Sequence, residues 1–188
     1  MRLPTQRMIE STLTEIAKEL KVELGKKSHK VSTTPGSFTP IINYNLEFNY
    51  HTIPIKVICE LGNHNIAVSQ FKIELSMQHS NFIVDTRNHL IRILTLNKSP
   101  WKIKTNKKFV VRKLSKLLDT SGMTQLTKKQ AFEPTIIGKM MDTHFLLEIK
   151  FYLGFTNKED SIRPLINFNK SFIDYLQREY CGRDVQAD

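Results

Sequence analysis

The sequence predicts a single α+β domain in which an antiparallel sheet is packed by an N-terminal, a central basic and a C-terminal helix. Three observations predict this class. Apolar and polar residues alternate in 43–50 and 53–61, a Gly-Asn-His-Asn turn follows 53–61, and both ends of the chain space apolar residues by three and four. The strands do not alternate regularly with helices, which excludes a doubly wound parallel sheet.

Composition indicates that the chain can build one core. It has 188 residues, 40% of them hydrophobic, and a chain of this size buries roughly 70% of its unfolded surface. No apolar run approaches the roughly 18 residues of a membrane span. Two cysteines cannot make a disulfide framework, and the first 23 residues lack the apolar stretch of a signal peptide. We therefore expect a cytoplasmic protein.

The chain divides into four expected regions. Apolar residues at helical spacing predict an N-terminal helix over 5–24. Gly25 follows the last apolar position, as is typical of a helix C-terminus, so the first region is 1–25. Residues 26–40 have no period and carry Ser, Thr, Pro and Gly, so we interpret them as a loop or linker. Residues 41–181 form the α+β core domain, and the polar tail 182–188 is expected to fray.

The central strands are expected to form a hairpin near 53–77. Its second arm, 66–77, changes phase: Ile66 and Val68 have one parity, and Phe71 and Ile73 have the other. One extra residue at Ser69-Gln70 would restore a common face, which predicts a β-bulge there. Residues 81–96 fit strands or a short helix, and strands are favoured.

The second half is expected to hold two helices and a strand pair. A helix over 107–118 begins after a cap at Thr105 or Asn106, and a strand pair lies within 132–152. A last helix begins near Asp160 or Ser161, with Pro164 in its first turn.

The chain's formal charge of +10 is confined to one segment. Residues 92–129 hold eleven Lys and Arg but one acid, Asp119, and the rest of the chain is neutral. A block of one sign creates a directional potential. The function predicted is a non-enzymatic binding module whose basic 92–129 segment contacts an anionic partner, nucleic acid first. The candidate binding residues are Arg92, Lys98, Trp101, Lys102, Lys104, Lys107, Lys108, Arg112, Lys113 and Lys116.

The helix over 107–118 separates its apolar and basic residues. On a helical projection Val110, Leu114 and Leu118 lie on one arc, whereas Lys108, Arg112 and Lys116 lie opposite. Basic side chains of this kind can track phosphates, and an exposed Trp101 or Phe109 could stack on bases. The alternative interpretation is a solvated helix face with Trp101 in the core.

Other functions remain open. The same basic helix could lie on an anionic membrane, and a protein–protein or structural role fits every residue. A metal-dependent nuclease is a remote alternative: Glu148 and Lys150 share a strand face, as carboxylate and lysine do in such sites, with Asp142 six residues upstream. No spaced set of metal ligands or nucleophiles supports it, so we expect no enzyme activity, metal or cofactor.

Overall fold

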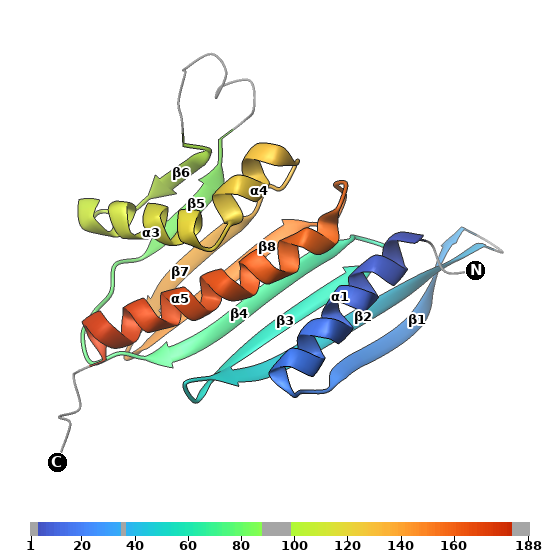
Figure 1. The fold of residues 1–188 in the computed structure, drawn as a ribbon, viewed down its shortest axis with the longest axis horizontal. Helices are drawn as coiled ribbons and strands as arrows, with labels where there is room; N and C mark the ends of the chain where they lie inside the picture. Colours follow the sequence, from blue (N-terminus) through green and yellow to red (C-terminus); the bar gives the residue numbers. More distant parts are fainter. Residues whose placement is uncertain (1–3, 35–36, 88–98, 182–188) are drawn as a thin grey trace.

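A computed structural model describes residues 4–34, 37–87 and 99–181 of the chain, which form a sheet covered by helices on one side (Figure 1). The elements in chain order are α1 (Pro4–Leu20), β1 (Leu24–Thr34), β2 (Ser37–Tyr50), β3 (Ile53–Leu61), β4 (Ile66–Glu74), β5 (Phe82–Thr86), β6 (Trp101–Lys104), α3 (Lys108–Thr120), α4 (Met123–Lys129), β7 (Thr135–Met141), β8 (His144–Tyr152), a 3-10 turn (Lys158–Ser161) and α5 (Ile162–Tyr180).

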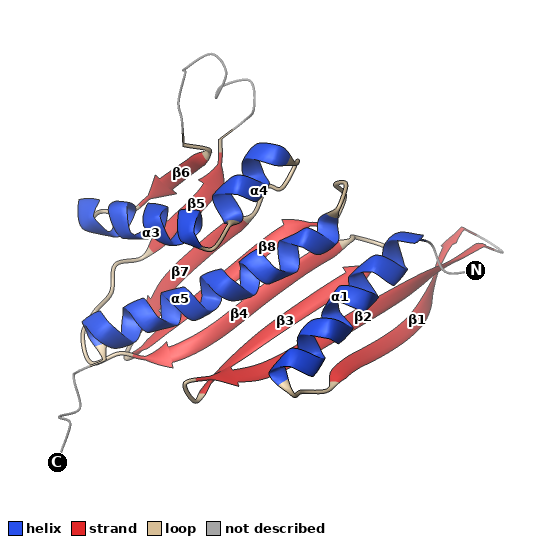
Figure 2. Cartoon of the chain, in the orientation of Figure 1, coloured by secondary structure: helices blue, strands red, loops and turns tan. Residues whose placement is uncertain are grey.

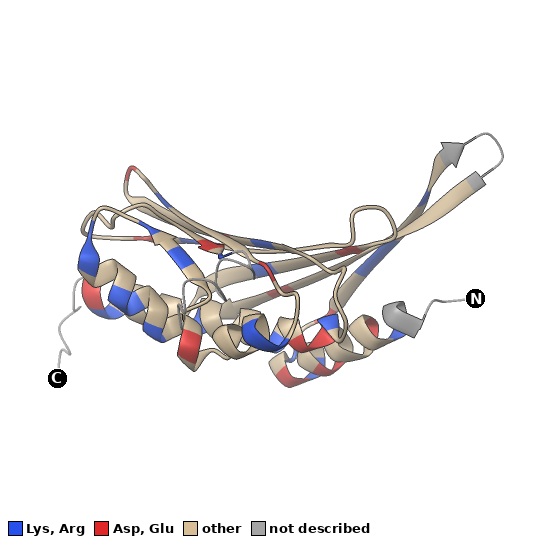
Figure 3. Cartoon of the chain, turned by 90° about the horizontal axis from the view of Figure 1, so that it is seen from above, with Lys and Arg blue, Asp and Glu red and all other residues tan. Residues whose placement is uncertain are grey.

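The eight strands form one antiparallel sheet in the order β1-β2-β3-β4-β8-β7-β5-β6 (Figure 2). The α+β class with an antiparallel sheet is therefore confirmed. Seen from above, the described helices lie on one side of the sheet, and no described helix covers the other face, which we call the open face (Figure 3). Alternate residues of the strands supply the core: in β8, Phe145, Leu147, Ile149 and Phe151 are buried under the helices.

The interpretation of 26–40 as a loop is wrong. Residues of this region pair in a hairpin of β1 and β2, from Leu24 opposite Leu46 to Thr34 opposite Ser37. Strand β1 shows no alternation because it lies at the edge of the sheet, and its side chains from residue 25 to residue 32 are exposed. A strand with no buried face has no need of apolar residues at every second position.

The first helix is also shorter than predicted. It ends at Leu20, because Lys21 adopts a left-handed conformation (φ 56°) and the Val22 N–H donates to the Ala17 carbonyl. Leu24 and Gly25, expected to end the helix, begin β1 instead. Helix α1 is fixed to α5 by two hydrogen bonds of 2.7 Å that Arg163 donates to the Glu19 carboxylate.

The predicted hairpin near 53–77 is present as β3 and β4, but without a bulge. Its register runs unbroken from Ile55 opposite Phe71 to Glu60 opposite Ile66. Ala67 and Ser69 face the helices, whereas Ile66 and Val68 are half-buried on the open face. The strand needs no bulge because Ser69 has a polar partner in the core. The side-chain amide of Asn169 in α5 donates to Ser69 Oγ at 2.7 Å, and both residues are fully buried.

The second half of the chain follows the prediction more closely. The strand pair is β7 and β8, and α5 follows Ser161 with Pro164 in its first turn. The expected cap of α3 by Thr105 or Asn106 is wrong, because Lys107 occupies that position and no side chain caps the helix. Within 81–96 the favoured strand is present as β5, and residues 88–96 lie outside the described chain.

Candidate nucleic-acid interface

Helix α3 has the two opposed faces that its sequence predicts. Val110, Leu114, Leu117 and Leu118 are buried against the sheet and α5. Lys108, Arg112 and Lys116 are exposed and follow one another at intervals of four residues, so each step rises about 6 Å along the helix. The helix therefore presents a row of three cations to solvent.

Trp101 belongs to the core and is no stacking surface. Only 3% of its surface is exposed, and its indole Nε1 donates a 2.8 Å hydrogen bond to Thr124 Oγ1 in α4. The indole thus anchors the edge strand β6 to the helix layer. The proposed contact of Trp101 with bases is wrong, because a base has no access to a ring buried there.

The fold divides the basic segment between two faces of the sheet. Lys102 and Lys104 alternate with the inward-facing Trp101 and Ile103, so they lie on the open face, opposite α3. Lys104 Nζ lies 3.3 Å from a carboxylate oxygen of Asp85. Arg92 and Lys98 are outside the described residues. The structure thus brings together the members from Lys107 to Lys116 and separates Lys102 and Lys104 from them.

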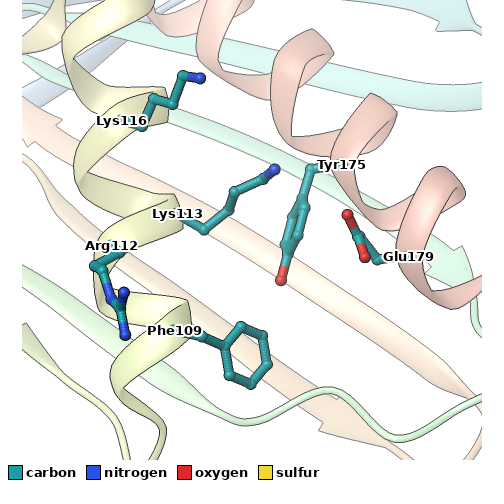
Figure 4. A pocket seen from close by; sticks show the side chains of 6 residues that line it. All are labelled: Phe109, Arg112, Lys113, Lys116, Tyr175 and Glu179. Carbon is teal, nitrogen blue, oxygen red and sulfur yellow. The ribbon is translucent and has the colours of Figure 1, made fainter.

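A groove of about 380 Å³ lies between α3 and α5 (Figure 4). Its lining comes from two helices far apart in sequence, with Phe109, Arg112, Lys113 and Lys116 on α3 and Tyr175 and Glu179 on α5. Phe109 is 48% exposed. It is the one apolar residue that interrupts the basic arc in the sequence. The ring points into the groove.

Two cations in this region lie over aromatic rings. Lys113 Nζ is 5.0 Å from the centre of the Tyr175 ring, and Lys107 Nζ is 5.9 Å from the centre of the Phe109 ring. Such contacts hold the ammonium groups beside apolar surface without neutralising them. Among the described residues, Lys108, Arg112, Lys113 and Lys116 form no ion pair, so their charges are available to an anion.

A buried histidine lies beside Tyr175, one of the residues that line the groove. His79 is 4% exposed and is surrounded by the rings of Phe82, Phe145, Tyr175 and Tyr180. Its Nδ1 lies 2.7 Å from the Ser80 carbonyl, and since a carbonyl only accepts, Nδ1 carries the proton. Burial lowers the pKa of this imidazole, and the positive charge of Lys107 lowers it further.

Tyr175 and Glu179 are site residues that the sequence analysis missed. Both lie in the helical pattern of α5, where Tyr175 reads as a core residue and Glu179 as a solvated one. Nothing in the spacing of either helix indicates that α3 and α5 lie beside each other. The only local signal is Phe109, which departs from its helix pattern.

The Glu148 and Lys150 pair does not assemble a metal centre. Both lie on the open face of β8, where Glu148 is paired with Gln70 and Ile137, and Lys150 with Val68 and Thr135. Asp142 lies in the turn before β8, and six residues of extended chain span up to ~20 Å. Within residues 4–34, 37–87 and 99–181 no three His, Cys, Asp or Glu side chains are grouped to hold a metal ion.

In the described part of the chain, every helix is too short or too polar to cross a bilayer. No protein-family model, no curated protein and no solved structure matches the chain.

Proposed function

We propose that the protein is a non-enzymatic binding module whose basic 92–129 segment contacts nucleic acid. The observation that carries the proposal is the row formed by Lys108, Arg112 and Lys116, which is solvent-exposed and unpaired among the described residues. Cations that have no carboxylate partner in the protein can release the counterions of a phosphate backbone, which drives binding. Contacts to phosphates carry no sequence information, so we expect little discrimination between bases.

Binding to an anionic membrane is less well supported. An amphipathic helix binds lipid by inserting its apolar face. In α3 that face is occupied, because Val110, Leu114 and Leu118 are each at most 1% exposed inside the core. Only the charges of α3 and the single ring of Phe109 would remain for the lipid.

A protein–protein interaction is the second candidate function. The open face of the sheet exposes Ile83, Ile137, Met141 and Tyr152, of which Tyr152 is 67% exposed. These side chains surround charged residues of both signs, among them Lys139, Glu148 and Lys150. A mixed surface of this kind fits a protein partner better than a polyanion.

We infer that the protein is located in the cytoplasm. Cys59 and Cys181 are both free thiols, and burial raises the pKa of the Cys59 thiol to about 12. An unreactive buried thiol in a chain without disulfides is typical of a reducing compartment.

The test is a side-by-side titration of single-stranded DNA, RNA, duplex DNA and anionic vesicles at several salt concentrations. The logarithm of the affinity should fall with the logarithm of the salt concentration, at a slope of about −0.7 per single-strand contact or −0.9 per duplex contact. Replacing Lys108, Arg112 and Lys116 together by Gln should weaken binding and flatten the slope by about 2–3.

A matched control removes three charges elsewhere. Lys72, Lys139 and Lys150 are exposed on the open face of the sheet, and their replacement by Gln should leave the slope unchanged. Equal losses from both triple variants would show that net charge, not α3, sets the affinity. Mg²⁺-dependent cleavage that Glu148→Ala abolishes would replace the proposal with the nuclease alternative.

A further inference from the structure

We infer that the groove between α3 and α5 receives an unpaired base of a single-stranded nucleic acid, stacked against Phe109, with the adjoining phosphates on Arg112 and Lys116. The inference rests on the proposed function and names its substrate class. It depends on three features of the groove: an exposed ring, an aromatic floor and an asymmetric distribution of charge.

The exposed ring is that of Phe109. It is the second residue of α3, 48% exposed, and its ring points toward the space beside Tyr175 (Figure 4). A phenylalanine in this position adds little to the core, whereas the face of its ring offers a base a stacking surface. Stacking is tolerant of sequence because every base has a π-face.

The floor of the groove is formed by the ring of Tyr175, a residue that is 3% exposed, and the Lys113 ammonium lies over this ring, 5.0 Å from its centre. The volume of about 380 Å³ is within the range of pockets that hold small ligands. A flat aromatic group can therefore enter between the two helices and remove the Phe109 ring from water. A duplex offers no such group, because its bases are stacked inside.

The charges of the groove orient a strand. Arg112 and Lys116 lie on α3 one helical turn apart, and Glu179 lies on the α5 wall (Figure 4). Glu179 repels phosphates from the α5 side, so the backbone follows α3 and the base points toward α5. The first turn of α3 contains no acidic residue, so the positive end of the helix dipole adds to the field.

The experiment compares three fluorescent probes of equal phosphate number at low salt: oligothymidylate, the same strand with abasic sites at its centre, and a duplex. Wild-type protein should bind oligothymidylate about tenfold or more tightly than the abasic strand, because stacking one base on an aromatic ring contributes an affinity of this order. Phe109→Leu should lower the affinity for oligothymidylate by the same factor and should hardly change the affinity for the abasic strand. The reason is that the substitution and the abasic sites remove the same stacking interaction.

The matched control is Phe38→Leu. Phe38 is 62% exposed in β2, a strand remote from α3, so this variant makes the same substitution at another exposed ring and should bind as the wild type does. Melting curves of both variants verify the fold. The comparison of probes with the wild-type protein needs no variant at all.

The outcomes separate the two proposals. Equal affinity of the wild type for oligothymidylate, abasic strand and duplex overturns the base pocket and leaves phosphate binding intact. Absence of binding to any nucleic acid at low salt overturns both, as does a preference for anionic vesicles over every strand.

Discussion

The indole of Trp101 and the hydroxyl of Thr124 form a buried hydrogen bond that joins the edge strand β6 to α4, with 2.8 Å between Nε1 and Oγ1. This contact decides the role of the only tryptophan in the chain. Its ring stabilises the fold from within the basic segment, and the row of exposed cations on α3 follows it in the chain.

Trp101→Ala should destabilise the protein by about 3–5 kcal/mol, since it leaves a large cavity in the core. Thr124→Val should cost about 1–3 kcal/mol, because the buried indole N–H loses its acceptor. Urea unfolding measures both values. If Trp101→Ala instead kept its stability and lost single-strand affinity, Trp101 would be a stacking residue after all.

Stability should decrease as the pH falls below about 6.5, the ordinary pKa of histidine. Burial lowers the pKa of His79 in the folded state, so below this pH the unfolded chain binds a proton that the folded chain excludes. Urea unfolding between pH 7.5 and pH 5 measures the effect, and His79→Gln should reduce it. The matched control is His64→Asn, which removes a histidine from an exposed turn.

Gly138→Ala should destabilise the protein by about 1–3 kcal/mol through overpacking. A Cβ at this position would lie 2.6 Å from Phe145 Cζ and would also meet the ring of Phe82. Both rings surround His79, so they have little room to move. Gly154→Ala is the matched control, since a Cβ there meets nothing within 4 Å, and its unfolding midpoint should not change.

Glu179→Gln should raise the affinity for single-stranded nucleic acid by up to about fivefold at low salt, since a pair of charges 4 Å apart in water interacts by ~1 kcal/mol. The gain should vanish at high salt because the repulsion is screened. Glu74→Gln, on the opposite face of the sheet, should have no effect. A lower affinity of Glu179→Gln would mean that this carboxylate accepts hydrogen bonds from the bound strand.

The elements that could be predicted from the sequence are those with one buried face and one exposed face. Strands β3 and β8 and helices α3 and α5 have a regular apolar period because the core constrains every second, third or fourth residue. Strand β1 was missed because its exposed side chains carry no such constraint. The bulge in β4 was wrongly predicted because Ser69 reads as a surface residue until its partner Asn169 is known.

The candidate site was predictable in part. The charged arc of α3 depends on local spacing alone and was visible in the sequence, whereas the groove depends on α3 and α5 lying side by side. The position of Trp101 also depended on tertiary structure, because an alternating Trp-Lys-Ile-Lys stretch fits either burial of the ring or its exposure.

The pairing of β4 with β8 has a consequence for how the chain folds. Strands β1 to β4 are consecutive hairpins, whereas Ile66 pairs with Tyr152, which lies 86 positions later in the chain. Because local contacts form faster than distant ones, we expect the first four strands to associate early. During synthesis the edge of β4 then stays open until β8 emerges, and α5, which supplies the partner of Ser69, follows later still. The half-made chain thus presents an unpaired strand edge, the feature by which nascent proteins most readily aggregate.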